Sequence, residues 1–519
     1  MTTFDTFNPF TTDGAAAPGV LALMFESLLM YSLDEESSAY GLLADDVSVA
    51  PDHRSATFRI RRNARFSNGD PVLASDVQYS FRVLASGAFA PAYQEVYADV
   101  MAVEAIDART VRFVFRKSDS ELPLWVGTMP VFSPKWLGAT PDGRRTLKVP
   151  IASGPYVIEQ SDGGRNITYK KNKNYWGRGI PFLRGLYNFD QVEYHLYPDR
   201  HQLAEAVKVG VVDYNVEYSV GNWLNAYKGD AQQSEKLFMR EFPYGSHGYM
   251  QGYMFNTRRP IFRDVRVRRA LAVAFDFESL NQREYAGKFR RLTSWFANSD
   301  LAADPAARKS NGAGSTRLRF SGDDHLKEAR QLLADAGWTM QDGLLRNVAG
   351  VPFTFEFIDE FATRNPGIKW YAHNLAQLGI SVQLNDVDSK VYHSKLDRFD
   401  FDMINTAMRT GDDPGRELRD RFGSRAAETR GSNNLSGVAS STADKLIDSV
   451  VTADTRSELV SSARSLDRFL MDQTLIVPFG YKDSEWVVYR SGLAFPDVLP
   501  RYYRPESWVL ETWWRTTNQ

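Results

Sequence analysis

The stretch "ARFSNGDPVLASDVQYSFRVL", residues 64–84, decides the first half of the fold because a turn motif separates two hydrophobic patterns there. Asn68 to Pro71 are turn-forming residues, and Ser75 with Gln78 three positions later has the spacing of a capping box. The apolar residues that follow are spaced as on one helical face: Val77, Phe81 and Leu84. We therefore predict a structural turn that leads into a capped helix.

Alternating apolar residues on both sides of this stretch predict strands. Every second residue is apolar in "ATFRI", residues 56–60, and again in "TVRFVF", residues 110–115, which is the period of a half-buried strand. The first half of the chain is therefore expected to be α+β with antiparallel strands.

The second half has a different pattern, which predicts an α/β arrangement between residues 253 and 480. "VPFTFEFID", residues 351–359, and "ISVQL", residues 380–384, alternate as strands do. Between them lies a helical stripe that ends at Gly379, a residue suited to a helix C-terminus. Strand, helix and strand form a βαβ unit, so a partly parallel sheet is expected. Further predicted segments are a helix capped by Asp264, a helix ending at Gly337, a helix over 459–470, a strand over 474–481 and a loop over 302–322.

Composition excludes several classes of protein. The chain has 519 residues, 43% hydrophobic and 24% charged, with a net charge of −2, as in an ordinary globular protein of several domains. A near-neutral charge argues against a nucleic-acid partner, and no apolar run is long enough to span a bilayer. There is no cysteine, so disulfides and thiol chemistry are excluded.

Catalytic and metal-binding motifs are not found. The seven histidines form no His-Glu-x-x-His motif, and the sequence has no Gly-x-Ser-x-Gly elbow and no P-loop. Paired carboxylates such as Asp412 and Asp413 are common in large proteins and are a weak sign of a glycosidase. We therefore predict a protein that is not an enzyme and carries no cofactor or metal.

Aromatic residues make up 13% of the chain and allow two interpretations. Most are expected in hydrophobic cores, since aromatic side chains dominate core packing. Some are expected to line a ligand cleft, because ligand sites are mostly apolar with a few polar groups. The candidates for such contacts are Tyr97, Trp223, Tyr253, Phe255 and Trp370.

Several stretches in order resemble the family 5 extracellular solute-binding proteins, the peptide-binding components of ABC importers. "ARFSNGDPVLASDVQYSF" is similar to a family segment that is scaffold rather than site, although Leu73 replaces the usual capping Thr. "SGPYVI", "KNKNYWGRGIPF" and "MFNTRRPIFRDVRVRRALAVAFDFESL" resemble later family segments. "WFANSDLAA" and "RELRDRFGSRAAETRGSNNLSGV" resemble the YejA-like subgroup. The resemblance covers nearly the whole chain.

The resemblance implies an α/β, two-lobed periplasmic-binding-protein fold of the cluster C type, with mixed sheets and hinge closure over the ligand. Lobe one would be residues 1–250, with an extra subdomain at about 36–150, and residues 485–519 would return to it. Lobe two would be residues 251–484.

The resemblance also implies where a ligand binds. Relatives hold a peptide α-amino group with an Asp in a loop similar to Thr410-Gly411-Asp412-Asp413-Pro414, so Asp412 is the first candidate and Asp413 the second. A solvated turn is the alternative. Arg409 and Asn256 complete the expected ligand-binding set.

The function implied is capture of oligopeptides or peptide conjugates for delivery to a membrane permease and ATPase. The alternatives are oligosaccharide or opine-like ligands in the same fold and, as another class, a glycoside hydrolase. The resemblance implies a periplasmic monomer; no signal peptide occurs in this sequence, whose N-terminus "MTTFDTFNPF" has neither a basic nor a long apolar region.

Overall fold

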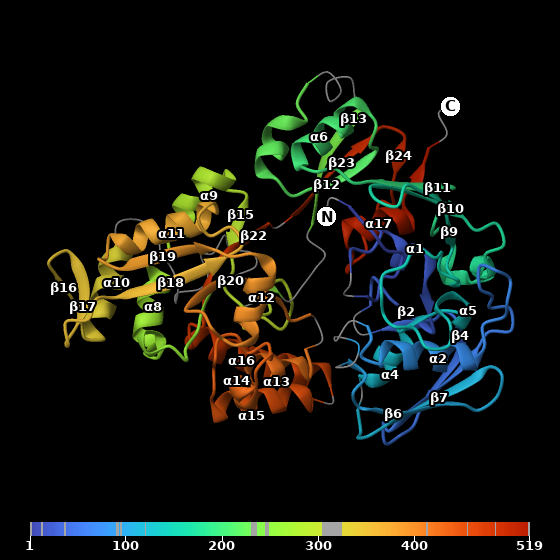
Figure 1. Cartoon of the computed structure of the whole chain (residues 1–519), viewed down its shortest axis with the longest axis horizontal. Helices are drawn as coiled ribbons and strands as arrows, with labels where there is room; N and C mark the ends of the chain where they lie inside the picture. Colours follow the sequence, from blue (N-terminus) through green and yellow to red (C-terminus); the bar gives the residue numbers. More distant parts are fainter. Residues whose placement is uncertain are drawn as a thin grey trace. The chain divides into compact units, whose positions relative to one another are not determined.

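The computed structural model describes residues 3–11, 14–35, 38–89, 93, 96–119, 121–229, 236–243, 249–303, 324–411, 414–453, 455–482 and 484–516. The chain forms two compact units, shown in Figure 1. Unit 1 comprises residues 1–245 and 485–519, and unit 2 comprises residues 246–484.

Unit 1 contains three antiparallel or mixed sheets and several short helices. The first sheet has the order β4 (Ala44–Val49), β5 (Ser55–Ile60), β7 (Thr110–Phe115) and β6 (Val100–Ala105). The second has the order β11 (Gln191–His195), β10 (Asn166–Lys171) and β9 (Tyr156–Ser161). The third has the order β12 (Tyr214–Glu217), β23 (Ser484–Arg490) and β13 (Leu237–Pro243). Short paired strands are β1 (Glu26–Ser27), β8 (Pro130–Val131), β2 (Leu29–Tyr31), β3 (Ala39–Gly41), β24 (Leu493–Ala494) and β25 (Trp514–Arg515).

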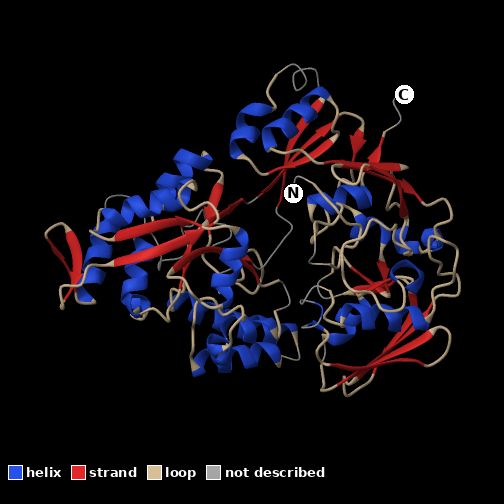
Figure 2. Cartoon of the chain, in the orientation of Figure 1, coloured by secondary structure: helices blue, strands red, loops and turns tan. Residues whose placement is uncertain are grey.

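The helices of unit 1 pack around these sheets (Figure 2). They are α1 (Val20–Met24), α2 (Ala74–Leu84), α4 (Leu122–Gly127), α5 (Pro134–Leu137), α6 (Arg200–Val209) and α17 (Pro505–Thr512), with single turns η1 (Trp176–Gly179), η2 (Pro181–Leu183) and η3 (Asn222–Ala226).

Unit 2 is built on a five-stranded mixed sheet with helices on both faces (Figure 2). The strand order is β19 (Ser381–Asp386), β18 (Thr354–Asp359), β20 (Met403–Arg409), β14 (Tyr249–Phe255) and β21 (Ile476–Pro478). Two small pairs accompany it: β15 (Phe289–Arg291) with β22 (Gly480–Lys482), and β16 (Trp338–Gln341) with β17 (Leu344–Asn347).

The helices of unit 2 fall into two groups by the core that they build. The first core contains residues of α8 (Val265–Val273), α9 (Phe277–Tyr285), α10 (Asp324–Asp335) and α11 (Pro366–Ala376). The second contains residues of α13 (Glu417–Phe422), α15 (Ser441–Val451) and α16 (Arg456–Asp472). The remaining helical segments are α12 (Ser389–Asp397), α14 (Ser424–Glu428) and η4 (Pro260–Phe262).

The predicted turn at residues 68–71 is confirmed. Gly69 has a φ of 89°, which favours glycine, and Gly69 N–H donates to the Phe66 carbonyl at 2.9 Å. Asp70 forms an ion pair with Lys135 at 2.8 Å. The motif therefore has a structural role in unit 1.

The predicted cap of the following helix is wrong. Helix α2 begins at Ala74, so Ser75 lies inside its first turn, and Gln78 donates instead to the Val103 carbonyl at 2.7 Å. Asp76 supplies the capping contact, because its carboxylate accepts a hydrogen bond from Leu73 N–H at 2.8 Å. An acidic side chain in the first turn also interacts favourably with the helix dipole.

The predicted βαβ unit is confirmed in unit 2. Strand β18 pairs in parallel with β19, and α11 connects them. Gly379 follows the helix with a φ of 73°, as expected of a helix C-terminus. Asp264 caps α8 by accepting from Arg266 N–H at 2.8 Å. The expected loop at 302–322 lies largely outside the described residues.

Close backbone packing in the central sheet requires glycine at one position. Gly252 of β14 lies opposite Pro478 of β21. A Cβ atom added to Gly252 would lie 2.0 Å from the Val477 carbonyl oxygen, which is far inside van der Waals contact. Within the described part of the chain, no helix is both long and apolar enough to cross a membrane.

Candidate ligand-binding site

One end of one face of the unit 2 sheet is left uncovered. Tyr253 and Phe255 of β14 are buried at 2% and 0% exposure, and Phe255 lies opposite the buried Met403 of β20. Farther along the same face, Ala407 and Arg409 of β20 are exposed, although β20 is an interior strand of the sheet. Exposure of an interior strand marks a surface that the helices do not cover.

The residues of β14 that pair with this part of β20 are half-buried. Gln251 lies opposite Ala407 and Tyr249 lies opposite Arg409. The Tyr249 hydroxyl donates to the Gln251 side-chain oxygen, so both side chains are on the same side of the strand. We call Tyr249, Gln251, Ala407 and Arg409 the open strand end.

The segment after the open strand end is anchored to the loop around Trp295. Thr410 is buried at 3% exposure, and its hydroxyl donates to the Trp295 carbonyl at 2.8 Å. Trp295 N–H in turn donates to the buried carboxylate of Asp467 in α16 at 2.8 Å. The "WFANSDLAA" segment thus holds the start of the Thr410 loop in place.

A second polar contact joins the loop around Trp295 to strand β22. The Tyr481 hydroxyl donates to the side-chain oxygen of Asn298 at 2.9 Å. Asn298 has a φ of 64°, a left-handed conformation that asparagine tolerates better than most residues. This contact ties the Trp295 loop to the strand that leads out of unit 2.

The charges near the open strand end have opposite signs. The Arg409 guanidinium forms no hydrogen bond or ion pair with the other described residues, while its carbonyl accepts from Arg421. Asp359 is the last residue of β18, Glu360 follows it, and β18 runs parallel to β20. Burial raises the pKa of Tyr392, and the charges of these two carboxylates add to the effect.

This arrangement is suited to binding and offers several kinds of contact. The Tyr392 hydroxyl donates to the Asn405 carbonyl of β20 at 2.8 Å, so the carboxylates near Tyr392 are close to this strand. A cation, an amide and an aromatic ring thus lie at one end of the β14–β20 pair, and two carboxylates lie at the carboxyl end of β18, which is parallel to β20. Ligand sites in α/β sheets form at such strand ends.

The structure places Tyr253 and Phe255 in the core. The Tyr253 ring stacks on Tyr371 with centroids 5.3 Å apart and makes edge contacts with Phe275 and Phe357. Phe255 packs against Phe262 at 5.2 Å. Their contacts are those of buried packing residues, so we do not include them in the proposed site.

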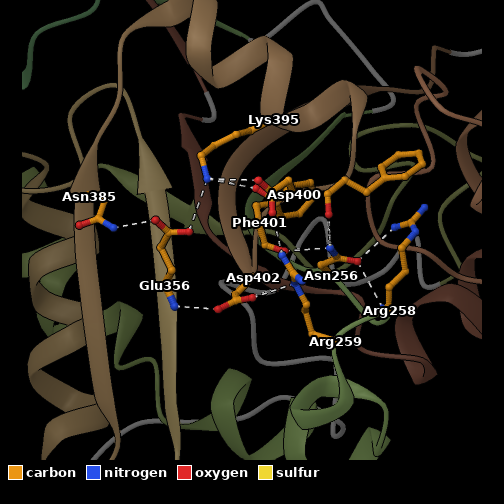
Figure 3. Close-up of polar contacts among 10 residues, drawn as sticks. Asn256, Arg258, Arg259, Glu356, Asn385, Lys395, Asp400, Phe401 and Asp402 are labelled. Atoms are coloured by element: carbon orange, nitrogen blue, oxygen red, sulfur yellow. Dashed lines mark hydrogen bonds and ion pairs between the residues drawn. The ribbon is translucent and has the colours of Figure 1, made fainter.

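Asn256 is also buried, and it lies at the other end of β20 from Arg409. Its side-chain amide donates to the Phe399 carbonyl at 3.0 Å and to the Phe401 carbonyl at 2.8 Å (Figure 3). Asn256 N–H donates to the Asp402 carbonyl at 3.0 Å. These bonds fasten the end of β14 to the segment that precedes β20.

Figure 3 shows the charged groups around this anchor. Arg259 pairs with Asp402 at 2.9 Å, and the second oxygen of Asp402 accepts from Glu356 N–H at 2.9 Å. Lys395 is 3.8 Å from Glu356 and 3.6 Å from Asp400. The charges are paired with one another, which indicates a structural network.

The other aromatic candidates lie in separate cores. In unit 1, Tyr97 is 5% exposed and stacks on Tyr93, whereas Trp223 is 7% exposed and stacks on Trp486 at 5.3 Å. Trp370 of unit 2 is half-buried, and its indole N–H donates to the Asp276 carbonyl at 2.9 Å. Each of these residues is thus held by contacts within its own unit.

Asp412 and Asp413 lie outside the described residues, so their role as ammonium ligands stays a prediction. Of the candidates predicted from sequence, Arg409 is the one that belongs to the open strand end. The other three residues of the open strand end, Tyr249, Gln251 and Ala407, were not among the candidates predicted from sequence. The sequence did carry a signal for two of them, because Tyr249, Gln251 and Tyr253 are spaced two residues apart and side chains with that spacing lie on the same face of a strand.

The fold and this site are those of a binding protein with two units and a mixed α/β sheet in the second. Residues 38–429 match the model of the bacterial extracellular solute-binding proteins, family 5 Middle. The chain therefore belongs to the family 5 extracellular solute-binding proteins.

Individual relatives agree with this assignment. The chain is 34% identical to "Probable peptide-binding protein YejA" of Agrobacterium fabrum, over 98% of this chain and 87% of that protein. It is 29% identical to "Peptidoglycan-binding protein YepA" of the same species, over 99% of this chain and 88% of that protein. The solved structure of the oligopeptide-binding protein AppA from Bacillus subtilis with a nonapeptide has a TM-score of 0.74 and 19% identity, covering 100% of this chain and 97% of that chain.

The family assignment confirms the two-lobed periplasmic-binding-protein fold and the resemblance to YejA. The proteins of this family are binding components of ABC importers and not enzymes, and they are periplasmic or extracellular. They deliver ligands to permease and ATPase components of the importer.

Proposed function

We propose that this protein captures oligopeptides or peptide conjugates in the periplasm and delivers them to the membrane permease of an ABC importer. The observation that carries the proposal is the exposed Arg409 guanidinium on an uncovered interior strand, free of other described partners. A free cation at this position is suited to a ligand carboxylate, and charge-assisted hydrogen bonds are stronger than neutral ones.

The carboxylates are suited to the other end of a zwitterionic ligand. Asp359 and Glu360 lie near Tyr392 in unit 2, and Asp412 is the residue favoured by resemblance to bind an α-amino group. A buried ammonium group requires such a counter-ion, because an isolated buried charge is costly. The polar backbone of a peptide is then paired by main-chain groups, as in strand addition.

We further propose that the two units act as lobes that close over the ligand. A ligand that binds the closed state more tightly shifts the population toward that state. Hinge closure of this kind is common among periplasmic binding proteins. Small-angle X-ray scattering should then give a smaller radius of gyration at saturating ligand, and an unchanged radius would contradict closure.

A sugar-containing ligand is the second candidate. The observation that favours it is the relative named for peptidoglycan binding, which matches 99% of this chain. A ligand that combines sugar and peptide would use the same charged groups together with aromatic surface. Opine-like conjugates fall within the same alternative, since they also carry carboxylates.

The test begins with native mass spectrometry of the purified protein, which identifies any ligand retained from the cell. Libraries of oligopeptides, oligosaccharides and muropeptides are then compared by the shift of melting temperature, and the mass of each ligand is measured after incubation. Retained or stabilising peptides that stay intact support the proposal. Stabilisation by oligosaccharides alone would favour the second candidate, and cleavage of a ligand without its retention would contradict a binding function.

A further inference from the structure

A pocket lined mainly by arginine lies in unit 1 at one end of the β4-β5-β7-β6 sheet. Its volume is about 410 Å³. The residues that line it come from β4, from β5 and the turn after it, and from the residue before β7; they are Asp45, Arg59, Arg61, Arg62, Asn63 and Arg109. We call this set the arginine pocket.

Backbone carbonyls hold two of these arginines in fixed orientations. Arg61 donates to the Leu42 carbonyl at 2.8 Å and to the Gly41 carbonyl at 2.9 Å. Arg109 donates to the Ile60 carbonyl at 3.4 Å. A carbonyl positions a guanidinium without cancelling its positive charge, so both side chains keep donors and charge for another partner.

The carboxylates nearby neutralise only part of the charge. Arg59 pairs with Asp45 at 2.7 Å and lies 4.0 Å from Asp46. Asp107 is near Arg109, but its oxygens accept from the backbone of Arg109 and from the backbone and hydroxyl of Thr110. These hydrogen bonds lower the pKa of Asp107, the charge of Arg109 adds to the effect, and no ion pair joins the two side chains.

Arg62 is an exposed cation of the pocket. Its side chain is exposed and forms no hydrogen bond or ion pair with the residues that the structure describes. Arg61, Arg62 and Arg109 therefore line one pocket with no carboxylate ion pair among the described residues. Like charges that are only partly neutralised repel one another, and an anion in the pocket would relieve this repulsion.

We propose that the arginine pocket binds a phosphate-type oxyanion. Guanidinium groups offer paired N–H donors that match the oxygens of phosphate, and several of them can share one dianion. The phosphate group could be free phosphate or the headgroup of a lipid, because both present the same oxygens. The residues of the arginine pocket belong to unit 1, whereas the residues of the ligand site proposed above belong to unit 2.

Isothermal titration calorimetry of the full chain with inorganic phosphate tests the proposal. At low ionic strength we expect one saturable site that weakens as sodium chloride is added, since salt screens exposed charges. Arg62→Gln and Arg109→Gln should each weaken binding roughly tenfold, the loss of one charged hydrogen bond. Arg54→Gln is the matched control, because Arg54 is an exposed arginine at the opposite end of β5 that donates to the Arg116 carbonyl.

Both arginine variants are checked for unchanged melting temperature. Arg62→Gln decides the matter if Arg109→Gln does not fold, because the Arg62 side chain is exposed and forms no hydrogen bond or ion pair with the described residues. Absence of phosphate binding to the wild type, or equal binding by Arg62→Gln and Arg54→Gln, would overturn the proposal.

Vesicle sedimentation separates the two sources of phosphate. Phosphatidylglycerol vesicles that bind the wild type but not Arg62→Gln would assign the site to a lipid headgroup, with phosphatidylcholine vesicles as the uncharged comparison. Phosphate binding without vesicle binding would assign it to a free phosphate compound. The wild type could instead bind vesicles but not inorganic phosphate, and Arg62→Gln could bind the vesicles equally well. That result would contradict a phosphate site in this pocket.

Discussion

Tyr249 lies directly opposite Arg409 in the antiparallel pairing of β14 and β20, at the end of a sheet face that is fully buried at Phe255. Burial therefore decreases along a single pair of strands from a packed core to an exposed cation. This gradient separates residues that stabilise unit 2 from residues that are free to contact a ligand, and it gives two opposite expectations for mutation.

Arg409→Gln should weaken ligand binding and leave stability unchanged. The side chain is exposed and has no partner among the described residues, so its replacement should change the free energy of unfolding by less than about 0.5 kcal/mol. Loss of a charged hydrogen bond to a ligand carboxylate should lower affinity roughly tenfold to a hundredfold. Calorimetry with a retained ligand measures this, with Arg398→Gln as an exposed control in the same unit; equal affinity of both variants would remove Arg409 from the site.

Asn256→Ala should have the reverse effect. The change leaves the Phe399 and Phe401 carbonyls without their amide donor and removes the oxygen that accepts from Arg258 at 3.1 Å. Unpaired buried polar groups should lower the free energy of unfolding by roughly 2–4 kcal/mol. Denaturant unfolding measures this loss of stability. The dissociation constant of the folded variant for the ligand should stay within about twofold of the wild-type value, since polar contacts away from a ligand are not part of its binding free energy. A large loss of affinity with normal stability would make Asn256 a ligand residue.

Asp412→Asn tests the residue that sequence resemblance favours as the ammonium ligand. Breaking a buried charged pair typically costs roughly 3–5 kcal/mol, or about two to four decades in affinity. N-acetylated peptides lack the charge, so they should bind the wild type weakly and lose little more on mutation. Calorimetry of both peptides with both proteins forms a double-mutant cycle. Additive losses would show that Asp412 does not meet the amino group.

Gly252→Ala should destabilise unit 2 strongly. The added methyl group would lie 2.0 Å from the Val477 carbonyl, so β14 and β21 would have to separate. Overpacking of this kind costs roughly 3 kcal/mol or more. Gly179→Ala is the control, because nothing lies within 4 Å of its Cβ position. Thermal unfolding of both variants should show a loss for Gly252→Ala alone.

Glu26 should make the stability of unit 1 dependent on pH. Its carboxylate is buried and accepts from Trp176 Nε1 at 2.9 Å and from the Tyr175 hydroxyl. Burial raises the pKa of Glu26 from 4.5 to about 7, against the opposing effect of these hydrogen bonds. A raised carboxyl pKa means that the folded state holds the proton more tightly, so stability is highest below pH 4.5 and is lost as the pH rises toward 7.

The expected loss is roughly 3 kcal/mol between pH 4.5 and 7, from the size of the pKa change. Glu26→Gln does not titrate, so the difference in unfolding free energy between wild type and variant isolates this group from other carboxylates. Denaturant unfolding at several pH values gives that difference. A difference that does not vary with pH would mean that Glu26 is ionised in the folded protein.

The strands and helices with strong periodicity were predictable because each carries its own signal. The alternation of residues 351–359 and the helix before Gly379 gave the βαβ unit, and Asp264 gave a helix cap. The cap of α2 was mispredicted because Asp76 and Ser75 both suit a first turn, and the start of the helix at Ala74 decides between them.

The site was less predictable than the fold because it depends on which strands are neighbours. Tyr253 and Gln251 have the same orientation on β14, yet one is buried and the other half-buried. What covers each of them is set by helices distant in sequence, such as α11, whose Tyr371 stacks on Tyr253. Composition marked the aromatic residues as important but could not divide them between core and ligand surface.

The position of β23 determines the order in which the protein can be completed. This strand, Ser484–Arg490, lies between β12 and β13 in the third sheet of unit 1. During synthesis β12 and β13, which lie within the first 243 residues, are made long before β23, the strand that joins them. Unit 1 is therefore the first unit to be started, but its third sheet is completed only after unit 2 has been made. Pairings so distant in sequence form slowly. The third sheet of unit 1 therefore stays incomplete until residues 484–490 have been made, so a chain that stops before them would leave β12 and β13 without the strand that joins them.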